Sequence, residues 1–145
     1  MDGLYSQKIL TLVANIDRIG QLDAPDARAK AVSKLCGSKV CVDMNMRDGI
    51  VTDFAHEVEA CALGQASSAI MAREIIGASP DELHNVARDM RRMLKENGHP
   101  PQNSDRGGNW SELCLLESVR EYKNRHASTL LTFEAVEDCL AQLGV

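Results

Sequence analysis

A two-residue turn signal inside an alternating stretch constrains the fold of this chain more than any other feature. Asp48-Gly49 stands between two runs in which apolar and polar residues alternate. An Asp-Gly pair in this setting is among the strongest short sequence signals for a β-hairpin. The alternation starts near Val40, and the return run extends from Ile50 to about Ala60, as in half-buried strands. One face of the return strand is expected to carry Ile50, Phe54, His56 and Val58.

The predicted hairpin also brings two distant cysteines to one end of the sheet. Cys36 and Cys61 lie at similar sequence distances from Asp48-Gly49, and residues at equal distances from a turn face each other in an antiparallel pair. After Cys61 the apolar spacing changes from strand to helix, so we expect this cysteine at a helix N-terminus, which stabilises a thiolate. The mostly small residues from Gly64 to Ala69 indicate that another element of the fold, or a ligand, approaches this turn closely.

The remaining segments are predicted to be mainly helical. Helices are expected at Leu4 to Ile19, after Cys61, at Pro80 to about Glu96, at Leu113 to about Tyr122, and at about Ser128 to Leu143. A further strand is expected within Ala27 to Leu35. We therefore predict a single α+β domain over residues 1–145, in which a small antiparallel β-sheet of about three strands has an N-terminal helix before it and several helices packed on one face.

Composition and charge argue against several classes of protein. The 145 residues carry a formal net charge of −5, which argues against a dedicated nucleic-acid binder. No apolar run approaches the roughly 18 residues of a membrane span, and no signal peptide is recognisable. The five cysteines are odd in number and include no CxxC pair. We therefore expect a cytoplasmic protein whose cysteines are thiols or metal ligands, and the sequence leaves its oligomeric state open.

Two cysteine motifs flank the hairpin, Leu-Cys-Gly-Ser at residues 35–38 and Ala-Cys-Ala-Leu-Gly-Gln-Ala-Ser-Ser at residues 60–68. With the Tyr5-Ser6-x-Lys8-Ile9 start and the helical C-terminal half, this arrangement resembles the IscU/NifU-type iron–sulfur cluster assembly scaffold family, and is most similar to its SufU-like and NifU N-terminal members. The resemblance implies an IscU/SufU-like fold and a scaffold that binds iron, a transient [2Fe-2S] cluster or zinc through cysteines. It also implies two kinds of partner, a cysteine desulfurase that donates sulfur and the recipient apo-proteins.

The resemblance implies a ligand set that this chain matches only in part. In that family three cysteines and an aspartate surround the metal site. Here Ser38 stands where the aspartate is expected, and Ser128 stands where the third cysteine is expected. The implied metal ligands are therefore Cys36, Cys61 and His126. Auxiliary candidates are Ser38, Asp43, Arg125, Ser128 and Cys114.

The two serines keep two alternatives open beside the scaffold function. One is a degenerate homologue that acts as a binding or regulatory module without a cluster, and the other is a zinc-dependent sulfur-transfer protein. No phosphate-binding loop, nucleophile elbow or paired-carboxylate signature indicates an enzyme, although sulfur-carrier activity would fit a cysteine at a helix N-terminus. We expect His56 to be a core histidine, and Cys41 and Cys139 to have no part in the site.

Overall fold

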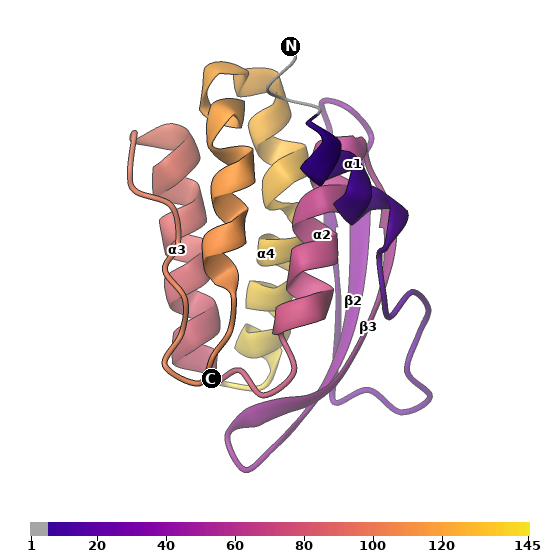
Figure 1. Cartoon of the computed structure of the whole chain (residues 1–145). Coiled ribbons are helices and arrows are strands. Elements are labelled where there is room, and N and C mark those ends of the chain that lie inside the picture. The colour runs from indigo at the N-terminus through magenta and orange to yellow at the C-terminus, as the bar shows by residue number, and fades with distance from the viewer. Residues whose placement is uncertain (1–5) are drawn as a thin grey trace.

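The computed structural model describes residues 6–145 and has the α+β architecture that the sequence predicts (Figure 1). In chain order the elements are α1 (Gln7–Ala14), β1 (Ala27–Val32), β2 (Lys39–Arg47), β3 (Ile50–Glu59), α2 (Ala62–Glu74), α3 (Pro80–Lys95), the 3₁₀ helices η1 (Trp110–Glu121) and η2 (Lys123–Arg125), and α4 (His126–Gln142). No helix among residues 6–145 is long and apolar enough to cross a membrane.

The three strands form one antiparallel sheet in the order β1-β2-β3. Asp48 and Gly49 both have positive φ angles, 53° and 79°, as a two-residue turn that matches the twist of a hairpin requires. The register shifts between Asn45 and Met46. Because of this shift, Val51 is fully buried and Ile50 is exposed, so the prediction that Ile50 shares the buried face was wrong.

The helices pack on one face of this sheet, as predicted. In Figure 1, α2 and α4 lie against the sheet and α3 lies on the outer side of α4; α4 contacts β1 and β2, and α2 contacts β3. The core between these layers is aliphatic, and its largest aromatic members are Trp110 and Phe133, both almost completely buried. The side chain of Ser79 accepts a hydrogen bond from the backbone N–H of Glu82 and caps α3, as its position before Pro80 predicts.

The first helix is shorter than the expected span from Leu4 to Ile19. Leu4 lies outside the described residues, and α1 ends at Ala14. Arg18 has a positive φ of 62°, and Ile19 forms a parallel bridge with His56 on β3. The apolar residues after Ala14 therefore pass along the edge of the sheet and do not prolong the helix.

His56 lies in the core, as expected. Its side chain is fully buried, and its Nε2 lies 2.8 Å from the carbonyl oxygen of Asp17. The edge segment is held further by backbone hydrogen bonds from Gly20 N–H to the carbonyl of His56 and from His56 N–H to the carbonyl of Arg18. Burial lowers the pKa of His56, and the contact with Asp17 offsets this only in part.

Candidate functional site at the end of the sheet

Cys36 lies in the loop that joins β1 to β2. The loop is closed by backbone hydrogen bonds from Ser33 N–H to the carbonyl of Ser38 and from Gly37 N–H to the carbonyl of Ser33. Gly37 has a φ of 73°, a conformation that favours glycine. Both serines are buried, whereas Cys36 is exposed. The loop therefore presents Cys36 to solvent from a base of two buried, hydrogen-bonded serines.

Two hydroxyls surround the Cys36 sulfur. Its Sγ lies 3.3 Å from Ser33 Oγ and 3.1 Å from Ser38 Oγ. When the thiol ionises, both hydroxyls can donate to the thiolate, and these contacts lower the pKa of Cys36 to about 7. A large fraction of Cys36 is consequently thiolate near neutral pH, and the thiolate is the nucleophilic form.

Cys61 lies at the N-cap of α2, as the change of spacing predicts. Its extended backbone, with φ −65° and ψ 171°, places it just before the first helical turn. Burial raises the pKa of Cys61, but the Ser128 hydroxyl, the nearby backbone N–H groups of Gly64 and Leu63, and the charge of Arg125 leave the pKa lower than usual. This half-buried sulfur is therefore also stabilised as a thiolate.

The start of α4 forms the second wall beside Cys61. Cys61 Sγ lies 3.4 Å from Ser128 Oγ, and Ser128 is the residue that stands at the expected third cysteine position. The small residues of α2 make this approach feasible. A Cβ on Gly64 would lie only 2.9 Å from the carbonyl oxygen of Ser128, and Ser67 Oγ donates to the carbonyl of Thr129 at 2.9 Å. The small residues of α2 therefore allow another element of the fold, α4, to pack closely against it.

The hairpin places the two cysteine segments at the same end of the sheet. Lys39 at the start of β2 pairs with Glu59 at the end of β3, so the loop of Cys36 and the corner of Cys61 extend from adjacent strands. Each cysteine has a serine hydroxyl within hydrogen-bonding distance, from Ser38 and from Ser128 respectively. This arrangement offers two ionisable thiols suited to sulfur chemistry and soft metals.

Not every predicted ligand joins this pair. His126 begins α4, is buried, and directs its Nε2 to the carbonyl oxygens of Val119 and Arg120, each 3.1 Å away. Within residues 6–145 no group of three or more His, Cys, Asp or Glu side chains is arranged to hold a metal ion. The set of Cys36, Cys61 and His126 is therefore not assembled as a preformed three-ligand site in this structure.

Two auxiliary candidates also lie elsewhere. Asp43 accepts from Arg28 Nε at 2.6 Å, from Arg28 Nη2 at 2.8 Å and from the backbone N–H of Leu22 at 2.9 Å. The hydrogen bond from Arg28 lowers the pKa of this buried carboxyl, which serves to hold the edge segment on the sheet. Cys114 is exposed on η1, and the structure shows no contact between Cys114 and the two site cysteines.

The other cysteines are outside the site as well. Cys41 is half-buried on β2, with its register partners Lys30 and Glu57 on the flanking strands. Cys139 is fully buried in α4 with its Sγ 3.7 Å from the carbonyl oxygen of Val42, and burial raises its pKa to about 12. Ser33 is the residue that sequence reasoning missed. Its only signal is its position at the end of the β1 alternation, three residues before Cys36.

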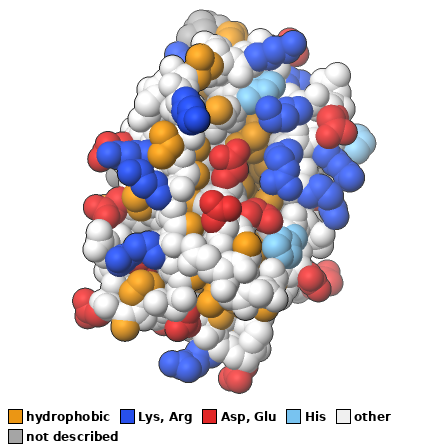
Figure 2. Space-filling model, turned by 180° about the vertical axis from the view of Figure 1, so that it is seen from behind, with side chains coloured by type: hydrophobic (Ala, Val, Ile, Leu, Met, Phe, Trp, Pro, Cys, Tyr) orange, Lys and Arg blue, Asp and Glu red, His pale blue; other side chains and the backbone are white. Residues whose placement is uncertain are grey.

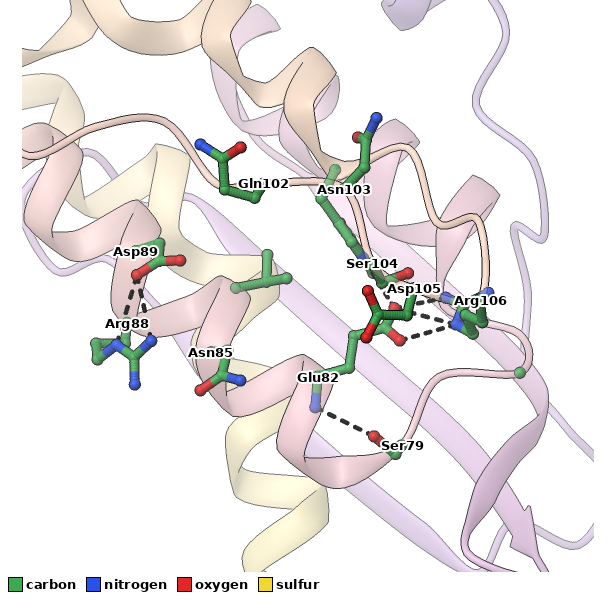
Figure 3. Close-up of a pocket in the computed structure, with 13 residues that line it drawn as sticks. Ser79, Glu82, Asn85, Arg88, Asp89, Gln102, Asn103, Ser104, Asp105 and Arg106 are labelled. Carbon is green, nitrogen blue, oxygen red and sulfur yellow. Dashed lines mark hydrogen bonds and ion pairs between the residues drawn. The ribbon is translucent and has the colours of Figure 1, made fainter.

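A cleft of about 560 Å³ between α3 and the loop of residues 102–106 contains neither site cysteine (Figure 3). Figure 3 shows Glu82 and Arg106 directed toward each other. Glu82 accepts from Arg106 Nη2 at 2.7 Å and from the indole N–H of Trp110 at 2.7 Å. These central polar groups satisfy one another, so their evident role is to fasten the loop to α3.

Comparison with known proteins places this chain in a family. A sequence profile described as the NifU-like N terminal domain matches residues 4–129. The iron–sulfur cluster assembly scaffold protein IscU of Thermotoga maritima is 23% identical over 141 residues, which cover 97% of this chain and 95% of the relative. The IscU of Streptococcus pyogenes is 24% identical over 121 residues, with 83% of this chain and 72% of the relative covered.

Solved structures of related proteins have the same fold. The crystal structure of a nitrogen-fixing NifU-like protein (N-terminal) from Brucella abortus superposes with a TM-score of 0.91 at 57% identity, covering 99% of this chain and 96% of that one. A putative iron–sulfur cluster assembly scaffold protein for the SUF system from Fervidobacterium islandicum has the same fold, with a TM-score of 0.79, 19% identity, and 94% and 96% of the two chains covered. This chain belongs to the NifU-like N-terminal domain family, the IscU/NifU-type group that its two cysteine motifs resemble.

Proposed function

We propose that this protein is a scaffold for iron–sulfur cluster assembly, with Cys36 as the sulfur acceptor and with Cys36 and Cys61 as the cysteines that hold the nascent cluster. The observation that carries this proposal is the presence of two thiols, each beside a serine hydroxyl, at one end of the sheet. The relatives named above as scaffold proteins support the same function. Such a scaffold carries cargo and is not an enzyme.

Cys36 is the better sulfur acceptor because it is exposed and because its pKa of about 7 leaves it partly ionised near neutral pH. Its thiolate would attack the outer sulfur of a persulfide on a cysteine desulfurase. A new S–S bond forms at Cys36 while the cysteine of the desulfurase leaves as a thiolate, so the step needs no external oxidant. A thiol reductant then supplies the two electrons that release the transferred sulfur as sulfide to iron.

The cluster would be cargo that this protein passes on, and the ligands that the two cysteine segments offer suit transient binding of it. Two thiolates are good ligands for iron, whereas the hydroxyls of Ser38 and Ser128 are poor ones. A [2Fe-2S] cluster on Cys36 and Cys61 would therefore keep coordination positions for ligands from outside the chain, such as the cysteines of a recipient apo-protein.

A labelling experiment tests the sulfur step. The protein is incubated anaerobically with a cysteine desulfurase and ³⁵S-cysteine, and labelled sulfur is mapped to individual cysteines by peptide analysis. We expect label on Cys36, its loss in Cys36→Ser, and its retention in Cys114→Ser. Equal labelling of wild type and Cys36→Ser would contradict the assignment of the acceptor.

A second candidate function is a binding or regulatory module that carries no cluster. One observation favours it, namely that serines occupy the two family positions beside Cys36 and Cys61 and fill them with hydroxyl contacts. The two functions differ in one readout. A regulatory module would alter the turnover of a cysteine desulfurase without acquiring sulfur or iron itself.

A further inference from the structure

A cleft of about 480 Å³ lies at the end of the helical layer where α3 and η1 end and α4 begins, at the top of the helices in Figure 1. Its walls come from the end of α3 and the residues just after it, the end of η1, η2 and the start of α4. The main lining residues are Leu94, Lys95, Asn97, Arg120, Lys123 and His126. Ser128 faces Cys61, whereas His126 lines this cleft, so the start of α4 separates the cleft from the cysteine site.

The cleft is cationic although the protein is acidic overall. Lys95, Arg120 and Lys123 line it, and Glu121 is the one carboxylate among the described lining residues. Within residues 6–145, Lys123 has no carboxylate within ion-pair distance, and Arg120 has one partner, Glu117, at 3.2 Å. Figure 2 shows Lys and Arg side chains on both flanks of the rear face, with a group of acidic side chains between them. Such a local excess of positive charge attracts anions.

Arg120 provides the second observation. Its Nε is buried and has no hydrogen-bond partner within residues 6–145, while its Nη2 donates to the carbonyl of Gly98 at 3.1 Å. The buried Nε is closed to a ligand in the cleft. Nη1 of this side chain, which is 22% exposed, makes no hydrogen bond within residues 6–145 and is the donor that a ligand can reach. His126 fixes this geometry, because its Nε2 donates to the backbone carbonyls of Val119 and Arg120.

We propose that this cleft binds a phosphate group. A guanidinium with an unused N–H and two lysine ammonium groups, contributed by separate segments, match the charge and the several acceptor oxygens of a phosphate dianion. The cleft is much larger than the ion, so a phosphate monoester of nucleotide size fits it as well as free phosphate. This site is independent of the cysteines and of the proposed scaffold function.

Amide chemical-shift titrations of the ¹⁵N-labelled protein test the proposal, with inorganic phosphate, adenosine 5′-monophosphate and adenosine as probes. Chloride is adjusted to keep the ionic strength constant, because surface charge effects are screened by salt. We expect saturable shifts centred on Lys95, Asn97 and Lys123 with the two phosphate probes and none with adenosine. Tighter binding of the monophosphate than of inorganic phosphate identifies an organic phosphate as the ligand, and equal binding identifies free phosphate.

Variants decide whether the cleft itself binds the probes. Lys95→Gln and Lys123→Gln should each weaken phosphate binding about tenfold, as expected for the loss of one charge-assisted contact. Arg120→Lys keeps the charge but removes the planar set of guanidinium donors, and should also weaken binding. The matched control is Arg47→Gln, an exposed cation in the hairpin, which should bind as wild type does. The absence of saturable shifts, or equal affinity in wild type, Lys95→Gln and Lys123→Gln, would overturn the proposal.

Discussion

The sulfur of Cys61 lies 3.4 Å from the hydroxyl oxygen of Ser128. This contact joins the N-cap of α2 to the first turn of α4, which are 67 residues apart in the chain. It places a hydroxyl where the family resemblance leads us to expect a thiol. The candidate site therefore has two cysteines, with a serine at the position where the family resemblance implies a third.

Ser128→Cys should convert the pocket into a stronger metal site. The new thiol would lie beside Cys61 and add a soft ligand in place of a hydroxyl that binds zinc and iron poorly. We expect zinc affinity to rise by about tenfold or more, equivalent to about 1.4 kcal/mol. Competition with a chromophoric chelator measures this affinity. Ser118→Cys, which adds an exposed thiol on η1, is the control, and an equal gain in both variants would show that the location of the thiol is irrelevant.

The reactivity of Cys36 should follow its two hydroxyl contacts. Ser33 and Ser38 lower the pKa of Cys36 to about 7, so its alkylation rate should rise with pH to a half-maximum near that value. Ser38→Ala removes one donor and should move the half-maximum to higher pH. Iodoacetamide labelling followed by peptide mass spectrometry resolves each cysteine. Cys139, whose pKa burial raises to about 12, should remain unlabelled throughout, and an unshifted Cys36 profile in Ser38→Ala would contradict this account.

Much of this arrangement could be predicted because it is encoded locally. Asp48-Gly49 sets the hairpin, and the hairpin places the segments of Cys36 and Cys61 at one end of the sheet. The direction of His126 could not be predicted in the same way. A helix turns about 100° per residue, so side chains two positions apart, such as those of His126 and Ser128, point to nearly opposite sides of α4. Which of them faces the cysteine depends on how α4 docks against α2, and that docking is a tertiary property.

The extent of the first helix shows a second limit. The apolar spacing up to Ile19 fits a helix, yet the structure uses Ile19 in a bridge to His56 on the sheet edge. Periodicity shows that apolar residues recur at a helical spacing, but it does not show which part of the fold those residues pack against. The contribution of Ser33 was missed for a related reason, because its contact with Cys36 depends on the folded loop between β1 and β2.

Gly64→Ala should destabilise the protein despite the higher helix propensity of alanine. The propensity gain is about 1 kcal/mol, whereas overpacking a rigid contact costs about 1–3 kcal/mol. The added Cβ would lie 2.8 Å from the Cβ of Ala60 and 2.9 Å from the carbonyl oxygen of Ser128, and neither atom can rotate away. Urea denaturation measures the difference. Asn85→Ala, at an exposed position of α3, reports the propensity gain alone, and stabilisation of both variants would show that α2 and α4 are not in close contact.

His56 should make the protein less stable in mild acid. Burial lowers the pKa of His56 in the folded state, so the unfolded chain binds the proton more readily below about pH 6.5. Stability should therefore rise with pH between the folded-state pKa and about 6.5, by at most about 1.4 kcal/mol per pH unit from this group. Urea midpoints from about pH 5 to pH 8 measure the slope. His56→Phe should flatten it, and an unchanged slope would assign the effect to other groups.

The most direct test of the scaffold function is the iron and acid-labile sulfide content per chain after anaerobic assembly with a cysteine desulfurase, cysteine and ferrous iron. We predict matched iron and sulfide with the visible absorption of a [2Fe-2S] cluster in wild type and in Cys114→Ser, and a loss of both in Cys36→Ser and in Cys61→Ser. Negligible iron and sulfide in wild type, or the same content in wild type and both site variants, would contradict the claim that Cys36 and Cys61 hold the cluster.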